Sequence, residues 1–217
     1  MKFWVCLGLF ALGSFGADIA AKMQEMIAKG EVPGAVTVVA TRDGISHLAA
    51  TGHADAAKTR PLTKDSIFWI ASMTKPIVSV AAMILVEEGK LTLADRVSRY
   101  IPEFADTKVS VETKKPDGTV ELGLEPQYRP MTVQDLMRHT SGLTYGFTGS
   151  NPVKQSYNDM KVMAPEQTNA EMAVKLSKLA LLYQPGTRWE YSMSTDVLVP
   201  GPSPVIRTMT SSSLAPS

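Results

Sequence analysis

The 217-residue chain predicts an α+β fold of the α/β-sandwich type, with antiparallel strands and flanking helices. Apolar residues recur at helical spacing in residues 18–29, 72–88 and 168–183. Residues 34–52 and 108–124 each consist of two strand-like runs around a turn that contains glycine, which is typical of an antiparallel hairpin. These two patterns predict both the strands and the helices of the fold.

Composition and charge limit the classes of function. The chain is 44% hydrophobic and 20% charged, as expected of a globular protein with one domain or slightly more. Its 22 Lys and Arg against 21 Asp and Glu give a net charge of +1. Such a chain lacks the basic field that nucleic-acid binding needs, so we expect no nucleic-acid partner.

Residues 1–17 predict an export signal. Lys2 precedes an apolar run at residues 3–12, and small residues lead to Ala17, near which we expect cleavage. The alternative is a membrane anchor, but the run is much shorter than the roughly 20 residues of a stable membrane span. The single cysteine, Cys6, would leave with the signal. A mature chain without cysteine suits a periplasmic or extracellular location.

The first elements after the signal are expected to be a helix and a hairpin. The helix occupies residues 18–29 and ends at Gly30, because glycine commonly follows a helix C-terminus. Strands at 34–41 and 44–52 are joined by a tight turn that contains Asp43-Gly44. Both elements have a packing role in this interpretation.

The next helix carries a serine and a lysine three positions apart, Ser72 and Lys75, which places them on one helical face. A lysine whose pKa is lowered by burial or by a neighbouring cation can accept the serine proton and activate the hydroxyl as a nucleophile. Composition alone gives about one Ser-x-x-Lys by chance, so the motif by itself proves nothing. An apolar stripe predicts that this helix is buried and central. The stripe consists of Met73, Ile77, Val80, Ala81, Ile84 and Leu85.

The segment Phe-Trp-Ile-Ala-Ser-Met-Thr-Lys-Pro at residues 68–76 resembles the first motif of the serine β-lactamase and penicillin-binding-protein superfamily. The resemblance is to the branch of class C β-lactamases, carboxylesterases and D-amino-acid peptidases. His-Thr-Ser-Gly-Leu at residues 139–143 agrees with it, and it covers roughly residues 19–198. It implies an antiparallel sheet flanked by helices and a mostly helical subdomain.

A second motif follows at residues 185–192, Pro-Gly-Thr-Arg-Trp-Glu-Tyr-Ser, which resembles the segment leading into the family's tyrosine motif. By this resemblance Tyr191 would relay the proton of Ser72 together with Lys75. In isolation Tyr191 would be interpreted as a half-buried aromatic residue after a turn. The family commonly has Tyr-x-Asn here, whereas this chain continues Tyr-Ser-Met-Ser. Ser194 is therefore the expected polar contact to substrate.

Other candidate residues are given smaller roles. Tyr145 opens a Gly-, Asn-, Pro- and Ser-rich stretch, residues 145–165, which we expect to be a loop that lines the binding pocket. His139 is interpreted as a hydrogen-bonded structural residue rather than a general base. Asp95 is interpreted as a cap or a solvated charge. The histidines have no evident ligand partners, so no metal site and no cofactor are predicted.

The resemblance stops at Leu198. The family continues with a helix, further strands and a third motif, whose backbone N–H supplies part of an oxyanion hole. Here residues 199–217 are rich in Pro, Ser and Thr and predict a disordered tail outside the family domain. Residues 18–198 are therefore expected to form an incomplete domain that lacks the C-terminal strands and helix.

The preferred hypothesis is a serine hydrolase that forms an acyl-enzyme on Ser72, with Lys75 and Tyr191 as proton-transfer partners. The substrate would be a small-molecule ester, amide or β-lactam, or a cell-wall peptide. The alternative is a truncated and catalytically inactive fragment or pseudoenzyme of the same family. A third hypothesis is a helical scaffold in which Ser-x-x-Lys is accidental.

Overall fold

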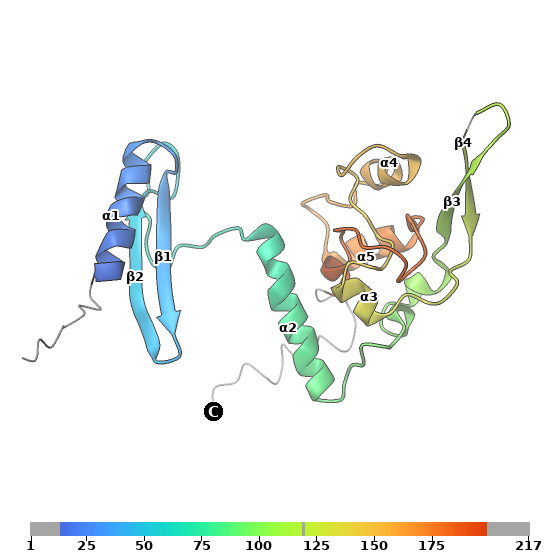
Figure 1. Cartoon of the computed structure of the whole chain (residues 1–217), viewed down its shortest axis with the longest axis horizontal. Coiled ribbons are helices and arrows are strands. Elements are labelled where there is room, and N and C mark those ends of the chain that lie inside the picture. The colour runs from blue at the N-terminus through green and yellow to red at the C-terminus, as the bar shows by residue number, and fades with distance from the viewer. Residues whose placement is uncertain (1–13, 119, 199–217) are drawn as a thin grey trace, which may run out of the picture. The chain divides into compact units, whose positions relative to one another are not determined.

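The computed structural model describes residues 14–118 and 120–198 (Figure 1). The predicted tail and most of the predicted export signal lie outside the described residues. The chain divides into two compact units, Met1–Trp69 and Ile70–Ser217, which are described separately. Within the described residues, no helix combines the length and the apolar character that crossing a membrane requires.

The first unit contains helix α1 (Ser14–Ala28) and the antiparallel strands β1 (Gly34–Thr41) and β2 (Gly44–Gly52). The helix lies along the hairpin and contacts both strands (Figure 1). The predicted hairpin and helix are both present, and Gly30 follows the helix with a φ of +75°. The helix begins four residues earlier than predicted and runs through Ala17, the expected cleavage point.

The second unit is mainly helical and contains one further hairpin. Its elements in chain order are η1 (Ala71–Met73), α2 (Thr74–Glu87), η2 (Val97–Arg99), η3 (Pro102–Asp106), β3 (Val109–Lys114), β4 (Val120–Glu125), α3 (Val133–Met137), α4 (Pro152–Asp159), α5 (Asn169–Ser177) and η4 (Thr195–Leu198). The strands β3 and β4 are antiparallel, as the sequence predicts for residues 108–124.

Two expectations about this unit are wrong. The stretch 145–165, expected to be a loop, contains the helix α4, which begins after an Asn151 cap whose side chain accepts the Lys154 N–H. The helix α5 ends at Ser177 rather than near Tyr183. It ends early because Leu181 leaves the helix and forms a parallel bridge with Val109.

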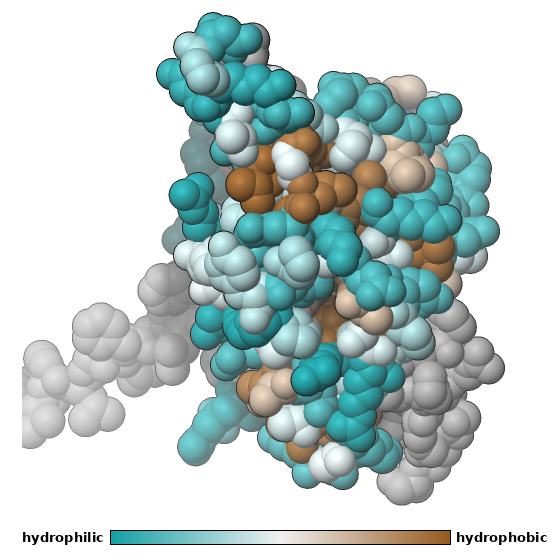
Figure 2. Space-filling view, turned by 90° about the vertical axis from the view of Figure 1, so that its right-hand side faces the viewer, coloured by the Kyte–Doolittle hydropathy of each residue, from teal (hydrophilic) through white to brown (hydrophobic). Residues whose placement is uncertain are grey.

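The main core of the second unit lies among α3, α4, α5 and the segments between them. The fully buried side chains that centre it include Leu136, Leu143, Tyr157, Leu176 and Leu181. The surface in Figure 2 is largely hydrophilic, with hydrophobic areas between the polar residues. This is the ordinary distribution for a folded unit, whose surface always keeps some apolar area.

The prediction that α2 is a buried, central helix is not confirmed. Met73, Ile77 and Val80 are each at least 60% exposed, and of the predicted stripe only Leu85 is fully buried. Leu85 packs in a small cluster with Leu91 and other apolar residues. The helix therefore uses one side for packing within its unit and presents most of its apolar stripe on the other.

Candidate active site

Ser72 and Lys75 lie at the start of α2 but have different environments. Ser72 is in the preceding turn η1, and its side chain is exposed. Among the described residues the Ser72 hydroxyl has no hydrogen-bond partner. Ala71, immediately before it, has a φ of +44°, a left-handed conformation that is costly for a residue with a Cβ. Lys75, in the first turn of α2, is buried and 8% exposed.

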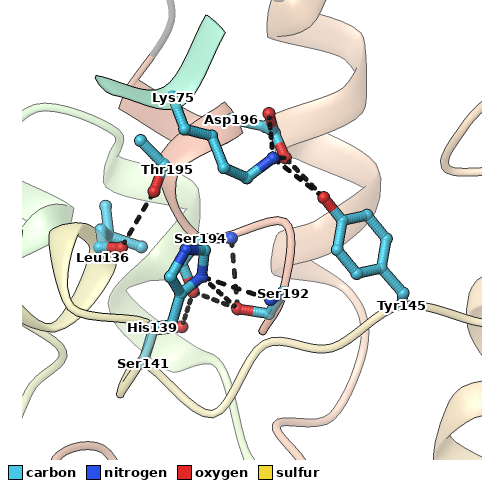
Figure 3. Close-up of polar contacts among 9 residues, drawn as sticks. All are labelled: Lys75, Leu136, His139, Ser141, Tyr145, Ser192, Ser194, Thr195 and Asp196. Atoms are coloured by element: carbon cyan, nitrogen blue, oxygen red, sulfur yellow. Dashed lines mark hydrogen bonds and ion pairs between the residues drawn. The ribbon is translucent and has the colours of Figure 1, made fainter. Parts of the chain in front are cut away.

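The Lys75 ammonium group is held by two side chains from distant parts of the unit (Figure 3). Its Nζ donates a hydrogen bond to the Tyr145 hydroxyl at 3.0 Å. The same Nζ lies 3.0 Å and 3.1 Å from the two carboxylate oxygens of Asp196. The Tyr145 hydroxyl in turn donates to Asp196 at 3.1 Å. The three side chains thus form a closed triangle of polar contacts.

Tyr191 borders the same ammonium group with its ring. The Lys75 Nζ is 5.3 Å from the centre of the Tyr191 ring and 5.7 Å from that of Tyr145. The two tyrosine rings are 5.8 Å apart. Such distances allow cation–π attraction between the lysine and both rings. Tyr191 thus faces Lys75 with its ring, whereas the described hydroxyl partner of Lys75 is Tyr145. The role of Tyr191 in proton transfer stays a prediction.

The contacts of Lys75 determine its charge. Burial lowers the pKa of Lys75, but the hydrogen bonds that it donates to Tyr145 and Asp196 and the negative charge of Asp196 together raise the pKa above its ordinary value. For Tyr145, burial raises the pKa of the phenol, although the contact with Lys75 opposes this. At neutral pH Lys75 is therefore an ammonium ion and Tyr145 a neutral phenol. The sequence-based expectation of a lysine with a lowered pKa is wrong for this arrangement.

Asp196 is the functional residue that the sequence analysis missed. It lies in η4, five positions after Tyr191, and is the only charged residue in residues 191–198. An isolated acid in an otherwise uncharged segment next to a tyrosine motif was the available signal. Its omission explains why the charge of Lys75 was predicted wrongly.

A buried chain of hydroxyl groups lies beside the triangle (Figure 3). His139 Nδ1 accepts the backbone N–H of Ser192 at 3.2 Å. The Ser192 hydroxyl is 2.6 Å from that of Ser194, which is 2.5 Å from that of Ser141. All three serines are fully buried. Ser194 links two segments of the unit here, and its contact with substrate stays a prediction.

His139 itself has a structural environment, in agreement with the sequence analysis. Its ring packs on Tyr191 with 4.8 Å between ring centres. Burial and the nearby charge of Lys75 lower the pKa of His139, which makes it a neutral hydrogen-bond acceptor. Asp95 likewise caps a turn, where it accepts the Thr92 N–H and pairs with Arg99.

Two further ion pairs support the segments that carry the site. Asp135, in α3, receives both guanidinium nitrogens of Arg129 at 2.6 Å and 2.8 Å and the Thr140 hydroxyl at 3.0 Å. The second pair joins Lys154 of α4 to Glu190 at 3.0 Å. The first pair connects α3 to the segment before it, and the Thr140 hydrogen bond connects α3 to the turn after it. The second pair connects α4 to the residue before Tyr191.

No metal centre accompanies this cluster in the described part of the chain, where no group of three or more potential ligands occurs. A surface cavity of about 330 Å³ exists in the second unit. Its lining comes from residues 96–98, 104–108, 126–127 and 130–131 and includes none of the triangle residues. The cavity is therefore separate from the cluster around Lys75.

A family model for β-lactamases matches residues 19–200. The chain therefore belongs to the β-lactamase family, in agreement with the motifs around Ser72 and Tyr191.

Individual relatives agree with this assignment. Protein Rv1367c of Mycobacterium tuberculosis is 38% identical over 180 residues, which are 82% of this chain and 43% of that protein. Esterase EstB of Burkholderia gladioli is 31% identical over 188 residues, or 85% of this chain and 44% of the esterase. The solved structure of EstCE1, a hydrolase with promiscuous acyltransferase activity, has a TM-score of 0.67 and 28% identity, covering 86% of this chain and 46% of EstCE1.

The chain spans less than half the length of these relatives. It thus contains part of the family's α+β fold, as the sequence analysis predicts.

Proposed function

We propose that this chain carries the nucleophile of an exported serine hydrolase that acts on small-molecule esters, amides or β-lactams. Esters are the preferred class, because the name of the Burkholderia relative states an esterase activity and another relative is a lovastatin esterase of Penicillium rubens. EstCE1 is named as a hydrolase, which supports the same class of reaction.

The observation that carries this proposal is the convergence of Tyr145 and Tyr191 on Lys75, which lies three positions after Ser72 at the start of α2. In the proposed reaction the Ser72 oxygen attacks the acyl carbonyl carbon and the bond to the leaving group breaks. The serine proton passes through Lys75 and Tyr191 to the leaving group. Water then attacks the acyl-enzyme, which releases the acid and restores the serine hydroxyl.

A second candidate is an inactive member of the family that binds such ligands without turning them over. Two observations favour it: the Ser72 hydroxyl has no partner among the described residues, and Asp196 holds Lys75 as a cation. An ammonium ion cannot accept the proton of serine. Labelling and hydrolysis experiments separate the two candidates.

We expect a fluorophosphonate to modify Ser72 in the folded full-length chain, because only an activated serine reacts quickly with this class of reagent. Residue-level mass spectrometry would locate the adduct. Ser72→Ala should abolish it, whereas Ser79→Ala, which removes another serine of α2, should leave it intact. Absence of an adduct on Ser72 in a folded sample would contradict the proposed nucleophile.

Measurements of hydrolysis then distinguish the active hydrolase from the inactive candidate. We expect release of p-nitrophenol from a p-nitrophenyl ester of butyrate, with a loss of about a thousandfold or more in Ser72→Ala. A chromogenic cephalosporin tests the β-lactam class in parallel. Equal rates for the wild type, Ser72→Ala and Ser79→Ala would favour the inactive candidate.

A further inference from the structure

Asp196 contacts two polar groups of the proposed active site, the Lys75 ammonium group and the Tyr145 hydroxyl. We propose that Asp196 is a positioning residue that keeps Lys75 as an ammonium ion and fixes the Tyr145 hydroxyl beside it. The catalytic meaning of this role rests on the proposed function. The charge of Lys75 can be measured independently of any activity.

The ion pair is well shielded from solvent. Side-chain exposure is 10% for Lys75 and 27% for Asp196, and both carboxylate oxygens lie within 3.1 Å of the Lys75 Nζ. Charges in such surroundings interact more strongly than exposed pairs, because less water screens them. Removal of the carboxylate would leave a buried ammonium group without its counter-charge.

The directions of the hydrogen bonds follow from chemistry. An ammonium group can only donate, so the contact between Lys75 and Tyr145 must run from nitrogen to oxygen. The phenol proton of Tyr145 is then directed to the carboxylate of Asp196. The Lys75 Nζ thus donates to three oxygens, that of Tyr145 and the two of Asp196.

The other titratable groups near Lys75 do not provide a counter-charge. His139 is electrostatically coupled to Lys75, which lowers the pKa of His139 and favours its neutral form. Tyr191 faces Lys75 with its ring. Among the described groups packed around this lysine, Asp196 is therefore the anion that retains the lysine proton.

This arrangement has a consequence for the reaction. Lys75 must lose a proton before it can accept that of Ser72, and the carboxylate in contact with it is that of Asp196, with an oxygen at 3.0 Å. Transfer of the proton along this contact breaks an N–H bond, forms an O–H bond and leaves a neutral amine and a neutral carboxylic acid. Asp196 would thus set the pH range in which Lys75 can act as a base.

The test measures the charge of Lys75 directly. The full-length chain is treated with trace acetic anhydride from about pH 6 to about pH 11, a range that includes the ordinary lysine pKa, and acetylation is quantified at each lysine by mass spectrometry. Only neutral amines react, so the midpoint of each profile reports the charge of that lysine regardless of its accessibility. We expect the wild-type Lys75 midpoint to lie above that of the exposed Lys108.

In Asp196→Asn we expect the Lys75 midpoint to fall, with acetylation at about pH 8 rising roughly three- to tenfold. Lys154 is the internal control, because it is also buried and ion-paired, to Glu190. The matched variant Glu190→Gln removes the carboxylate beside Lys154 and should leave the Lys75 profile unchanged. Asp196→Glu should keep the Lys75 midpoint close to that of the wild type.

Three results would overturn the proposal. The first is an unchanged Lys75 midpoint in folded Asp196→Asn, and the second is an equal shift of Lys154, which would indicate general loosening. The third result applies if Asp196→Asn does not fold, because the wild-type profile is then the deciding measurement. A wild-type Lys75 midpoint at or below that of Lys108 would overturn the proposal. Fluorophosphonate labelling of Ser72 is read separately, so failure of the proposed function leaves the Lys75 result interpretable.

Discussion

At the scale of single residues, Asp135 shows how a charge that is nearly inaccessible to solvent is retained. Its carboxylate receives hydrogen bonds from the Arg129 guanidinium, the Thr132 backbone N–H and the Thr140 hydroxyl. Burial alone would raise the pKa of Asp135, but these contacts outweigh burial and lower the pKa below its ordinary value. The ionised form therefore stabilises the folded state.

The sign of the pH dependence follows from that lowered pKa. The stabilisation is complete above the unfolded-state pKa of about 3.9 and is lost as the pH falls through the lower folded-state value. We expect Asp135→Asn to reduce the free energy of unfolding by about 2 kcal/mol or more at about pH 7, because Arg129 loses its counter-charge. The difference should narrow below about pH 4.

Urea denaturation of both proteins at the two pH values measures this difference. Asp159→Asn is the matched control, because Asp159 is an exposed aspartate at the end of α4. A cost for Asp135→Asn that is the same at both pH values would contradict the electrostatic explanation.

Which residue contacts were predictable depended on their separation in sequence. The capping box of Thr132 and Asp135 spans three positions, so a local Thr-x-x-Asp pattern specifies it. The contact between Lys75 and Asp196 spans 121 positions, and no local pattern specifies it. For the same reason the sequence could place Tyr191 near the site by resemblance but could not show that Tyr145 supplies the hydroxyl.

At the scale of elements, the beginning of α5 depends on a local signal and its end does not. α5 begins at a capping box of Thr168 and Glu171, which is again a local pattern that spans three positions. The end of α5 depends instead on pairing between Leu181 and Val109, a tertiary contact that overrides the helical spacing of the apolar residues. The turn after α3 also relies on such pairing, because Leu182 donates its N–H to the Gly142 carbonyl.

Gly142 offers a direct test of this turn. It has a φ of +88°, and a Cβ there would lie 2.3 Å from the Tyr183 carbonyl oxygen and 3.0 Å from the Leu181 Cβ. We expect Gly142→Ala to lower stability by more than about 2 kcal/mol, because the left-handed backbone and the backbone clash both oppose it. Thermal unfolding followed by circular dichroism would measure the loss.

Gly89→Ala is the control that measures the cost of the left-handed backbone without a clash. Gly89 has a φ of +68°, but a Cβ there would have no heavy atom within 4 Å. We expect it to cost only about 1 kcal/mol. Equal costs for the two variants would show that the packing of the turn against residues 181–183 contributes nothing.

At the scale of the whole molecule, the second unit has a buried core and also leaves apolar side chains exposed to solvent. The core of the second unit is well buried, yet α2 exposes Met73, Ile77 and Val80. The sequence pattern gave the correct helix but the wrong burial, because spacing reports which side is apolar and not whether another element covers it. The division into two units was likewise not evident from composition.

The connection between the two units should be the site of first proteolytic attack. Phe68 and Trp69 lie in a segment without helix or strand, and Trp69 is 95% exposed. Chymotrypsin cleaves after aromatic residues and needs several residues of locally unfolded chain, which this segment provides. We expect brief digestion to cut first after Phe68 or Trp69 and to release fragments that correspond to the two units.

Mass spectrometry of a digestion time course would identify that cut. Phe68→Ser combined with Trp69→Ser removes two exposed aromatic side chains at the end of the first unit and should delay the first cleavage. Tyr128 and Trp189 are also exposed aromatics, but their segments are tied by hydrogen bonds such as that from the Tyr128 N–H to the Gln184 side chain. A first cut after either residue would show that local order in the second unit is weaker than its contacts indicate.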